Sequence, residues 1–442
     1  MPLLQSSPIL TLPNEIIALI LAEVHKRDGG SVICSGQPTH SRDLNSAVQT
    51  VSQVNQQFRT LTFGTPTLWA DVYIRDLHPA RYHVLDACLE RSQLCPLNIN
   101  IQDDGLLSTA SYLPIVLTHH HRWKTLAVTS QSTSYIQKVI TMLQPLHTPR
   151  LESLTIQVYS DFPDTSQDNS YTPILQQGAP NLHSINLLNI SLLSCCPPLS
   201  ALKGLTNWIF QPTRAMNHCQ ISDVLLHSFS LTSLQLSSQA LLPCAGQKIT
   251  LISLPSLLDL YLDFNNIEER TLFRLFTALQ MPNLKFLGVR DVVHELAASF
   301  AHFIWGQSGS RYPALESLEL QSVDFTNLFT IDSVRPLQNI TSLALLDSNE
   351  DDALETAIAS ASVDGFSSPL WPRLRNLKIS YCNMDTLEDF IIMREQAGIP
   401  LTSLHFMDMP DYDIAMRIAE DEKQWLREHV PMVSFLRSRC SR

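Results

Sequence analysis

The sequence predicts an α/β protein in which an N-terminal helical module precedes a solenoid, with a parallel sheet on its concave side and helices on its convex side. Two observations carry this prediction. The phrase L-x-x-L-x-L returns about every 28 residues after residue 120, whereas the first 75 residues lack it and place apolar residues at helical spacing. Hydrophobic residues make up 44% of the chain and charged residues 16%, which is the composition of a folded protein.

The repeated phrase predicts short strands that stack side by side. Its three apolar positions are one turn residue and two inward-facing strand residues, because strand side chains alternate between faces. One copy alone cannot bury them, so neighbouring copies must share a core. From Trp123 to Leu401 there are 278 residues over ten intervals, a spacing within the about 20–29 residues of leucine-rich repeats. A generic leucine-rich α/β domain is the alternative. The copies begin at Trp123, Leu151, Leu182, Leu205, Leu231, Leu257, Leu284, Leu315, Ile340, Leu374 and Leu401.

Segments between the copies show helical spacing, as in residues 268–279. The longest interval, from Ile340 to Leu374, predicts an insertion around the acidic residues 350–352. The final segment, 411–442, lacks the repeated phrase, and we expect it to form a helix that caps the last repeat. A helix lying on a membrane is the alternative for this segment. The residues that share one face of this helix are Ile414, Ile418, Trp425 and Leu426.

The first 75 residues predict a small helical module. Leu12-Pro13 opens a helical stretch, since proline is well placed in a first helical turn. A polar insertion spans residues 25–42, and helical patterning resumes over residues 47–61. Residues 76–120 are expected to form a helical connector that leads into about 10–11 repeats over residues 121–410.

The module resembles an F-box, in the divergent form common in mushroom-forming fungi, where the box precedes irregular leucine-rich repeats. The resemblance lies in Leu12-Pro13-x-Glu15-Ile16-Ile17, in Val54-Asn-Gln-Gln-Phe58, and in Thr65-Pro-x-Leu68-Trp69. Asn55 stands where a cysteine is common, and Phe58 where a tryptophan is common.

This resemblance implies that the module binds a Skp1-type adaptor and, through it, a cullin–RING ubiquitin ligase. The residues implied in the contact are Leu12, Pro13, Ile16, Ile17, Ile20, Leu21, Val54, Phe58, Leu68 and Trp69. A three-helix piece of this size buries too little surface to be comfortably stable alone, which also favours a partner. The alternative is that these residues only pack the helices onto the first repeat.

The repeats are expected to bind a target protein through side chains that lie between the buried strand positions. Tyr261, Phe286 and Arg290 are favoured, because aromatic residues and arginine dominate binding hot spots. The alternative for each is a solvent-facing residue without a partner. The complete set is Asp259, Tyr261, Asp263, Phe286, Arg290, Glu319, Lys378, Tyr381 and His405.

Composition disfavours several other functions. The net charge of −12 and the lack of a polybasic run disfavour binding to nucleic acid or to an anionic membrane. Nine scattered cysteines without a C-x-x-C pair disfavour a disulfide framework and a structural zinc site. The apolar run Ile16–Ala22 is too short to be a membrane anchor, so we expect a cytoplasmic or nuclear protein with reduced thiols.

Motifs for catalysis do not appear in the sequence. There is no G-x-x-x-x-G-K-[ST], G-x-G-x-x-G, H-E-x-x-H or G-x-S-x-G pattern. Adjacent residues of His119–His121 point in different directions, so a solvated helix end is favoured over a metal site. We therefore expect no enzyme, no cofactor and no metal, and a substrate receptor of a Skp1–cullin–F-box-type ubiquitin ligase. A repeat scaffold without a role in ubiquitination, and an enzyme with an unrecognised site, are the alternatives.

Overall fold

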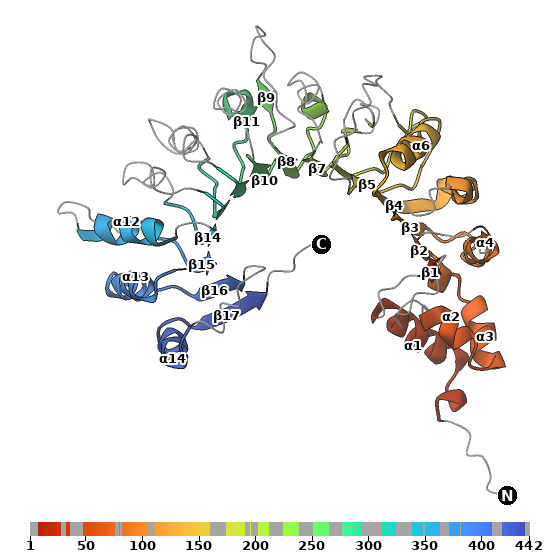
Figure 1. Ribbon diagram of the computed structural model, residues 1–442, viewed down its shortest axis with the longest axis horizontal. Coiled ribbons are helices and arrows are strands. Elements are labelled where there is room, and N and C mark those ends of the chain that lie inside the picture. The colour runs from red at the N-terminus through yellow and green to blue at the C-terminus, as the bar shows by residue number, and fades with distance from the viewer. Residues whose placement is uncertain are drawn as a thin grey trace, which may run out of the picture. The chain divides into compact units, whose positions relative to one another are not determined.

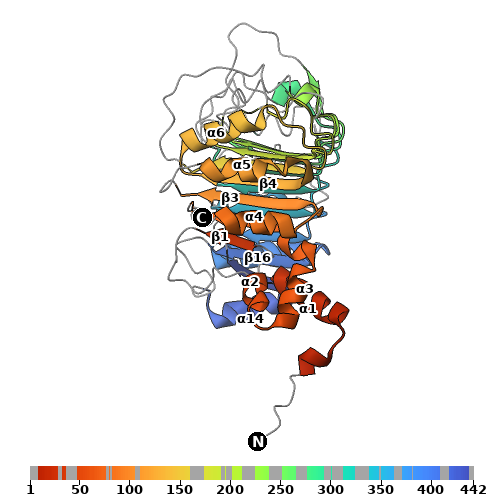
Figure 2. The same ribbon diagram turned by 90° about the vertical axis from the view of Figure 1, so that its right-hand side faces the viewer.

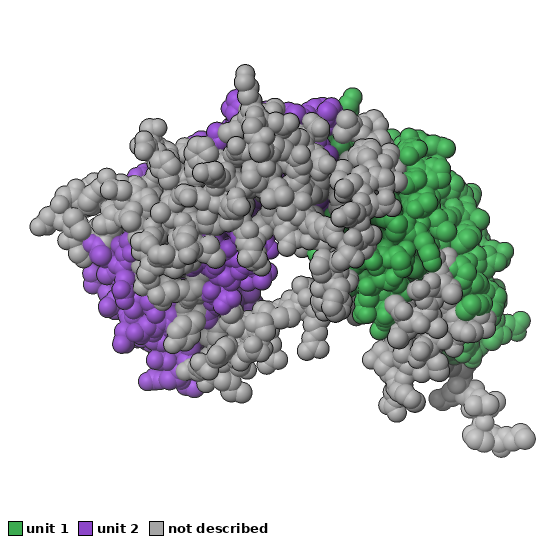
Figure 3. Space-filling model, turned by 45° about the horizontal axis from the view of Figure 1, so that its top comes forward, with its two compact units in different colours: residues 1–205 green, residues 206–442 purple. Residues whose placement is uncertain are grey.

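Short parallel strands that follow one another in chain order organise the computed structural model (Figure 1). The chain divides into two units, unit 1 (Met1–Leu205) and unit 2 (Thr206–Arg442), coloured separately in Figure 3. The structure describes residues 8–27, 32–35, 47–75, 79, 82–104, 110–159, 174–190, 195, 202–211, 224–237, 251–264, 276–292, 300, 312–323, 338–347, 350–362, 371–380, 382–408 and 418–437.

Unit 1 begins with the predicted helical module. Its helices are α1 (Asn14–Arg27), α2 (Ala47–Ser52) and α3 (Gln56–Phe63), and the short 3-10 helices η1 (Pro8–Thr11) and η2 (Pro66–Trp69) flank them. α1 packs against both α2 and α3. Asn55 caps α3, because its Oδ1 accepts the backbone N–H of Phe58 at 2.8 Å. An asparagine at this position therefore has a local structural role.

The polar insertion of the module contains a strand that the sequence analysis missed. β1 (Val32–Ser35) pairs in parallel with β2 (Asp71–Arg75), with Val32 opposite Val72. The helical module is thus tied to the sheet of unit 1 by its own insertion. The parallel strands also start well before residue 121, where the repeats were expected to begin. A strand of four residues inside a polar segment leaves too short an apolar pattern to be recognised.

The sheet of unit 1 continues in chain order from β2. Its further strands are β3 (Leu97–Asp103), β4 (Trp123–Ser130), β5 (Ser153–Val158) and β6 (Ser184–Leu188), all parallel. Helices lie on one side of these strands, as Figures 1 and 2 show for α4, α5 and α6. These helices and the short 3-10 turns between them are α4 (Tyr82–Arg91), η4 (Ala110–Tyr112), α5 (Leu113–Leu117), η5 (His120–Arg122) and α6 (Thr133–Leu143).

Unit 2 repeats the same arrangement with its own parallel strands. They pair in the order β7 (Asn207–Gln211), β8 (Ser233–Ser237), β10 (Asp259–Asp263), β12 (Phe286–Arg290), β13 (Ser317–Gln321), β14 (Ser342–Leu346), β15 (Asn376–Ile379), β16 (Ser403–Asp408) and β17 (Met432–Arg437). A separate small parallel pair joins β9 (Ile252–Ser253) to β11 (Leu279–Gln280). Every predicted copy of the phrase, from Trp123 to Leu401, leads into one of the strands β4 to β16.

The leucines of the phrase form the core, as predicted. In β10 the turn residue Leu257 and the strand residues Leu260 and Leu262 have no exposed surface. Leu260 pairs with Leu287, and the same register places Leu318, Leu343, Leu377 and Leu404 in one row. Full burial of such a side chain contributes about 1.5–3 kcal/mol. An α/β protein with a long parallel sheet is therefore established, and it is compatible with a leucine-rich-repeat solenoid.

Asparagines that follow the proline of the phrase connect successive repeats. The side-chain amides of Asn181 and Asn283 donate to the carbonyls of Pro149 and Pro255, at 2.7 and 2.8 Å. Each acceptor lies one repeat upstream of its donor. The turn residues of neighbouring repeats are thus held in register by side chains as well as by the sheet.

The segments outside the regular repeat differ partly from expectation. The long interval after Ile340 accommodates α12 (Glu350–Ser362), which packs against α13 (Met384–Gln396). The C-terminal segment holds α14 (Glu420–His429), as predicted, but it then adds β17 in parallel to β16. The terminal structure is thus a helix and a strand, because the backbone of residues 432–437 pairs with residues 403–408 of β16. Most of the predicted helical segment 268–279, and Ile414, lie outside the described residues.

An arginine fills the core between two repeats of unit 2. Arg394 of α13 is fully buried, and its guanidinium donates to the carbonyl oxygens of Trp371 at 3.2 Å and Leu374 at 2.6 Å. Burial lowers the pKa of Arg394 to about 10. The charge is tolerated because it satisfies carbonyls at the turn that precedes β15.

Replacing this arginine is expected to destabilise unit 2. Arg394→Ala removes the buried side chain and leaves both carbonyls without their donor, so we expect a loss of about 3 kcal/mol and a lower thermal unfolding midpoint. Arg373→Ala, at an exposed arginine of the same turn, is the matched control and should leave the midpoint unchanged. Equal midpoints for the two variants in differential scanning calorimetry would contradict this role.

Candidate functional site

The N-terminal module carries an exposed apolar surface. Ile9, Leu12, Ile16 and Leu19 keep 38%, 37%, 42% and 66% of their surface exposed. Ile16 and Leu19 are three residues apart on α1 and therefore lie on the same side of the helix. Val54, at the turn between α2 and α3, is 61% exposed. We call Ile9, Leu12, Ile16 and Leu19 the N-terminal apolar surface.

Other residues of the F-box resemblance lie inside the module. Ile17, Phe58, Leu68 and Trp69 are buried, whereas Pro13 is exposed and Ile20 and Leu21 are half-buried. In this structure the buried four pack the module itself, so a partner would contact the remaining residues. The burial of a tryptophan at the end of an apolar motif is a packing outcome that the sequence pattern does not show.

Trp69 links the module to helix α4 of unit 1. Its indole N–H donates to the carbonyl of Thr62 at 2.8 Å. The guanidinium of Arg91, at the end of α4, lies 4.7 Å from the Trp69 ring centre and 4.0 Å from that of Phe63. Such cation–π contacts add to the apolar packing. Trp69 thus packs the module against α4, whereas the N-terminal apolar surface remains exposed.

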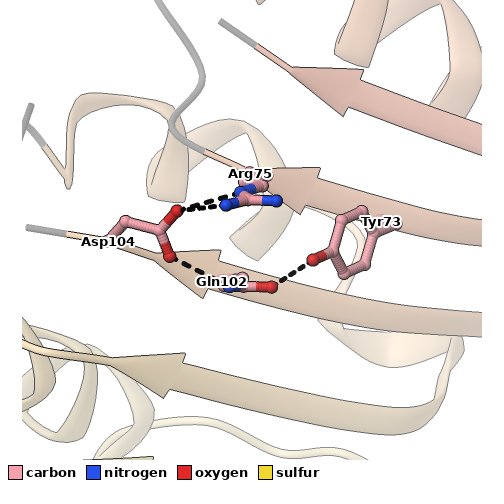
Figure 4. Close-up of polar contacts among 4 residues, drawn as sticks. All are labelled: Tyr73, Arg75, Gln102 and Asp104. Carbon is pink, nitrogen blue, oxygen red and sulfur yellow. Dashed lines mark hydrogen bonds and ion pairs between the residues drawn. The ribbon is translucent and has the colours of Figure 1, made fainter. Parts of the chain in front are cut away.

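A polar network on β2 and β3 satisfies its own hydrogen bonds (Figure 4). Arg75 Nε and Nη2 donate to Asp104 Oδ2 at 2.9 and 2.8 Å, and Gln102 Nε2 donates to Asp104 Oδ1 at 2.9 Å. Gln102 in turn accepts a hydrogen bond from the Tyr73 hydroxyl. Because both carboxylate oxygens already have charged or polar donors, we assign this network to stabilisation of the sheet.

The predicted target-binding residues come together on one face of the unit 2 sheet. They alternate with the buried leucines on β10, β12, β13, β15 and β16, so they lie on the opposite face, which we call the polar face. Tyr381 lies outside the described residues. The residues that the structure places on the polar face are Asp259, Tyr261, Asp263, Phe286, Arg290, Glu319, Lys378 and His405.

One row of the polar face alternates large and small side chains. The register aligns Tyr261, Gly288, Glu319, Ala344 and Lys378 on successive strands. Gly288 and Ala344 are buried, while the three larger residues are half-buried. Neighbouring strands lie about 4.8 Å apart, so the larger side chains stand about 10 Å apart with small residues between them.

Gly288 is a residue of this row that the target-binding prediction did not include. A Cβ at this position would lie 2.2 Å from Cδ2 and 2.7 Å from Cε2 of Tyr261, so the tyrosine ring occupies the space that a side chain would need. The Tyr261 hydroxyl reaches Gln321 Oε1, two strands away, at 3.4 Å. Glycine inside a strand is a known sign of close approach, and this signal was present in the sequence.

Two residues of this row, Glu319 and Tyr261, have shifted pKa values. Burial raises the pKa of Glu319, and the nearby Lys378 opposes this shift. Burial also raises the pKa of Tyr261 to about 12, with a further contribution from Glu319. Among the residues that the structure describes, no hydrogen bond or ion pair to the Glu319 carboxylate is found.

The remaining charged residues of the polar face differ in their partners. Arg290 Nε lies 3.1 Å from Asp291 Oδ2, in an ion pair that is largely open to solvent and therefore weak. His405 Nδ1 lies 2.6 Å from Ser434 Oγ, and burial followed by the charge of Lys378 lowers the pKa of the imidazole. His405 is thus favoured in its neutral form near neutral pH.

The described part of the chain contains neither a cluster of metal-ligating side chains nor a membrane-spanning helix. It holds no group of three or more histidine, cysteine, aspartate or glutamate residues with the geometry of a metal site. Its helices include none with the length and apolar character needed to cross a membrane. His120, within the predicted solvated helix end, places Nδ1 2.8 Å from the carbonyl oxygen of Leu117.

Comparisons with known proteins give matches among solved structures. No protein-family model and no curated protein sequence matches this chain. Among solved structures, the crystal structure of a TLR13–ssRNA13 complex is similar, with 14% sequence identity and a TM-score of 0.34. The match covers 71% of this chain and 43% of that chain, so this chain spans less than half of the length of that protein. The fold class therefore rests on the strands and register described above.

Filling the position of Gly288 is expected to displace Tyr261. Gly288→Ala should lower the thermal unfolding midpoint by an amount equivalent to about 1–3 kcal/mol, because the added methyl group overlaps the ring. In a Tyr261→Ala background the same change should cost much less. Gly204→Ala is the matched control, since its Cβ would meet only the Leu182 carbonyl oxygen at 3.6 Å. An equal cost in both backgrounds would contradict the contact.

Proposed function

We propose that this chain is a protein-binding adaptor, in which the N-terminal module docks a Skp1-type adaptor and the repeat strands bind a target protein. The observation that carries the proposal is the N-terminal apolar surface. Its four large apolar side chains are exposed within a short stretch of the chain, on a module whose own core is already filled by Ile17, Phe58, Leu68 and Trp69. Exposed apolar patches of this kind mark interaction sites.

The exposed area of these four side chains is too small to give a stable complex by itself. Burying the remaining exposed parts of Ile9, Leu12, Ile16 and Leu19 would contribute roughly 3–5 kcal/mol in total. Association costs an estimated ~4–15 kcal/mol. The flanking residues Pro13, Ile20 and Val54 must therefore take part in the contact. Trp69, buried in the module, contributes nothing to this sum.

A second function is a repeat scaffold that binds partner proteins without a role in ubiquitination. The burial of Leu68 and Trp69 favours it, because these two residues belong to the F-box resemblance and are committed to the module itself. Both functions are binding functions, and neither assigns a catalytic step to the chain. The two are distinguished by whether a cullin accompanies the Skp1-type protein.

The docking surface is tested by two charge substitutions. In Leu12→Asp with Ile16→Asp, two carboxylates would have to be desolvated on binding, so we expect the loss of at least about 90% of the co-purifying Skp1-type protein. Both residues are exposed, and the far-UV circular dichroism spectrum should be unchanged. Co-purification would be measured by affinity capture and mass spectrometry, which also reports whether a cullin is present.

The control for this experiment is Leu94→Asp. Leu94 is 80% exposed at the turn between α4 and β3, outside the helical module, so the same substitution there should leave co-purification intact. Full retention of the Skp1-type protein by the double variant would sink the docking proposal. Point substitutions are preferred to removal of residues 1–75, since such a deletion would also take β1 and β2 out of the sheet.

A further inference from the structure

We propose that the polar face of unit 2 binds its target through a basic side chain, lysine or arginine, seated between the carboxylate of Glu319 and the ring of Tyr261. The inference rests on that part of the proposed function which assigns target binding to the repeat strands. It adds the chemistry of the group that is recognised. The group bound at the polar face is thus a segment of a target protein that presents a lysine or arginine side chain.

Glu319 is half-buried, and its carboxylate has no hydrogen-bond or ion-pair partner among the described residues. A half-buried carboxylate loses part of its hydration, and proteins normally offset this loss with a hydrogen bond or an ion pair. The described residues supply neither to Glu319. In unit 1 the carboxylate of Asp104 shows the contrasting case, because Arg75 and Gln102 occupy both of its oxygens (Figure 4). Glu319 thus keeps acceptor capacity for a group from outside.

The side chains on either side of Glu319 favour a cation as its partner. On one side, Gly288 has no side chain, so the Tyr261 ring extends across β12 towards Gln321. An aromatic ring beside a carboxylate suits a cation, which gains both a charge-assisted hydrogen bond and a cation–π contact. On the other side, Ala344 stands between Glu319 and Lys378, and its small methyl group leaves space between these two larger side chains.

The charges around Glu319 and Tyr261 also favour a basic side chain. Lys378 stands two strands from Glu319, and its positive charge favours the ionised form of Glu319 without an ion pair between the two. Among the described residues near Tyr261, Arg290 already pairs with Asp291, so the negative charge of Glu319 is not neutralised by this arginine. The surface around the proposed site between Glu319 and Tyr261 is therefore complementary to a basic side chain and repels an acidic one.

The experiment is selection of peptides on the intact protein. A displayed library of random 12-residue peptides is selected against the full chain, and the bound peptides are sequenced. We expect lysine and arginine to be enriched at one position of the selected peptides. Synthetic versions of these peptides should bind Glu319→Gln at least about tenfold more weakly than the parent protein, as for the loss of one partner of a close charge pair.

Matched variants show whether the weaker peptide binding arises at the proposed site between Glu319 and Tyr261, which we call the seat. Glu316→Gln removes an exposed carboxylate at the start of β13, which pairs with Lys285, and should leave peptide affinity unchanged. Tyr261→Leu should weaken binding severalfold while keeping an apolar side chain of similar size. Circular dichroism and the thermal midpoint verify that each variant is folded.

The outcomes separate this inference from the proposed function. Peptides that compete for the polar face but lack an enriched basic residue would overturn the inference and leave target binding in place. Selected peptides that bind Glu319→Gln as well as the parent protein would overturn it in the same way. A library that yields no binders would overturn both. Enrichment of acidic residues would point instead to Lys378 and contradict the proposed seat.

Discussion

The structure depends on one constraint, the burial of three apolar side chains per repeat against the equivalent side chains of the next repeat. No repeat can satisfy this requirement alone, so the strands must lie parallel and in register. The row that runs from Leu260 through Leu287 to Leu318 is the direct result. Once the register is fixed, the residues between the leucines have no freedom to change face. Side chains at equivalent positions of successive repeats therefore line up in one row on the face opposite the leucines.

The first strand of unit 1 and the last strand of unit 2 join the sheet without carrying the repeated phrase. In unit 1 the insertion of the helical module supplies β1, which pairs with β2. In unit 2 the segment after α14 supplies β17, which pairs with β16 and stacks Phe435 on Phe406 with ring centres 5.1 Å apart. The terminal segments are thus part of the sheet as well as caps on its core.

The sequence predicted the repeating part of the fold well, because its cause is periodic. Leucine at fixed spacing reports burial directly, and even the weak copies at Trp123 and Leu205 lead into strands. β1, β2 and β17 were missed, since none of them carries the phrase. The polar face was predicted for the same reason as the core, since alternation along a strand follows from backbone geometry. The F-box resemblance implied one set of contact residues, and it did not reveal that Ile17, Phe58, Leu68 and Trp69 of this set are buried inside the module.

Interactions between neighbouring strands could not be predicted from the sequence, because they depend on the register of the strands. The sequence shows Tyr261 and Gly288 as separate residues, 27 positions apart, and only the register brings the ring of one onto the backbone of the other. The same holds for Asp104 and Glu319, which look alike as isolated carboxylates. In the structure Asp104 has two donors and serves the sheet, whereas Glu319 is half-buried between a tyrosine and an alanine. What separates a structural charge from a recognition charge is therefore the set of partners that the register provides. That set becomes readable only when adjacent repeats are placed side by side.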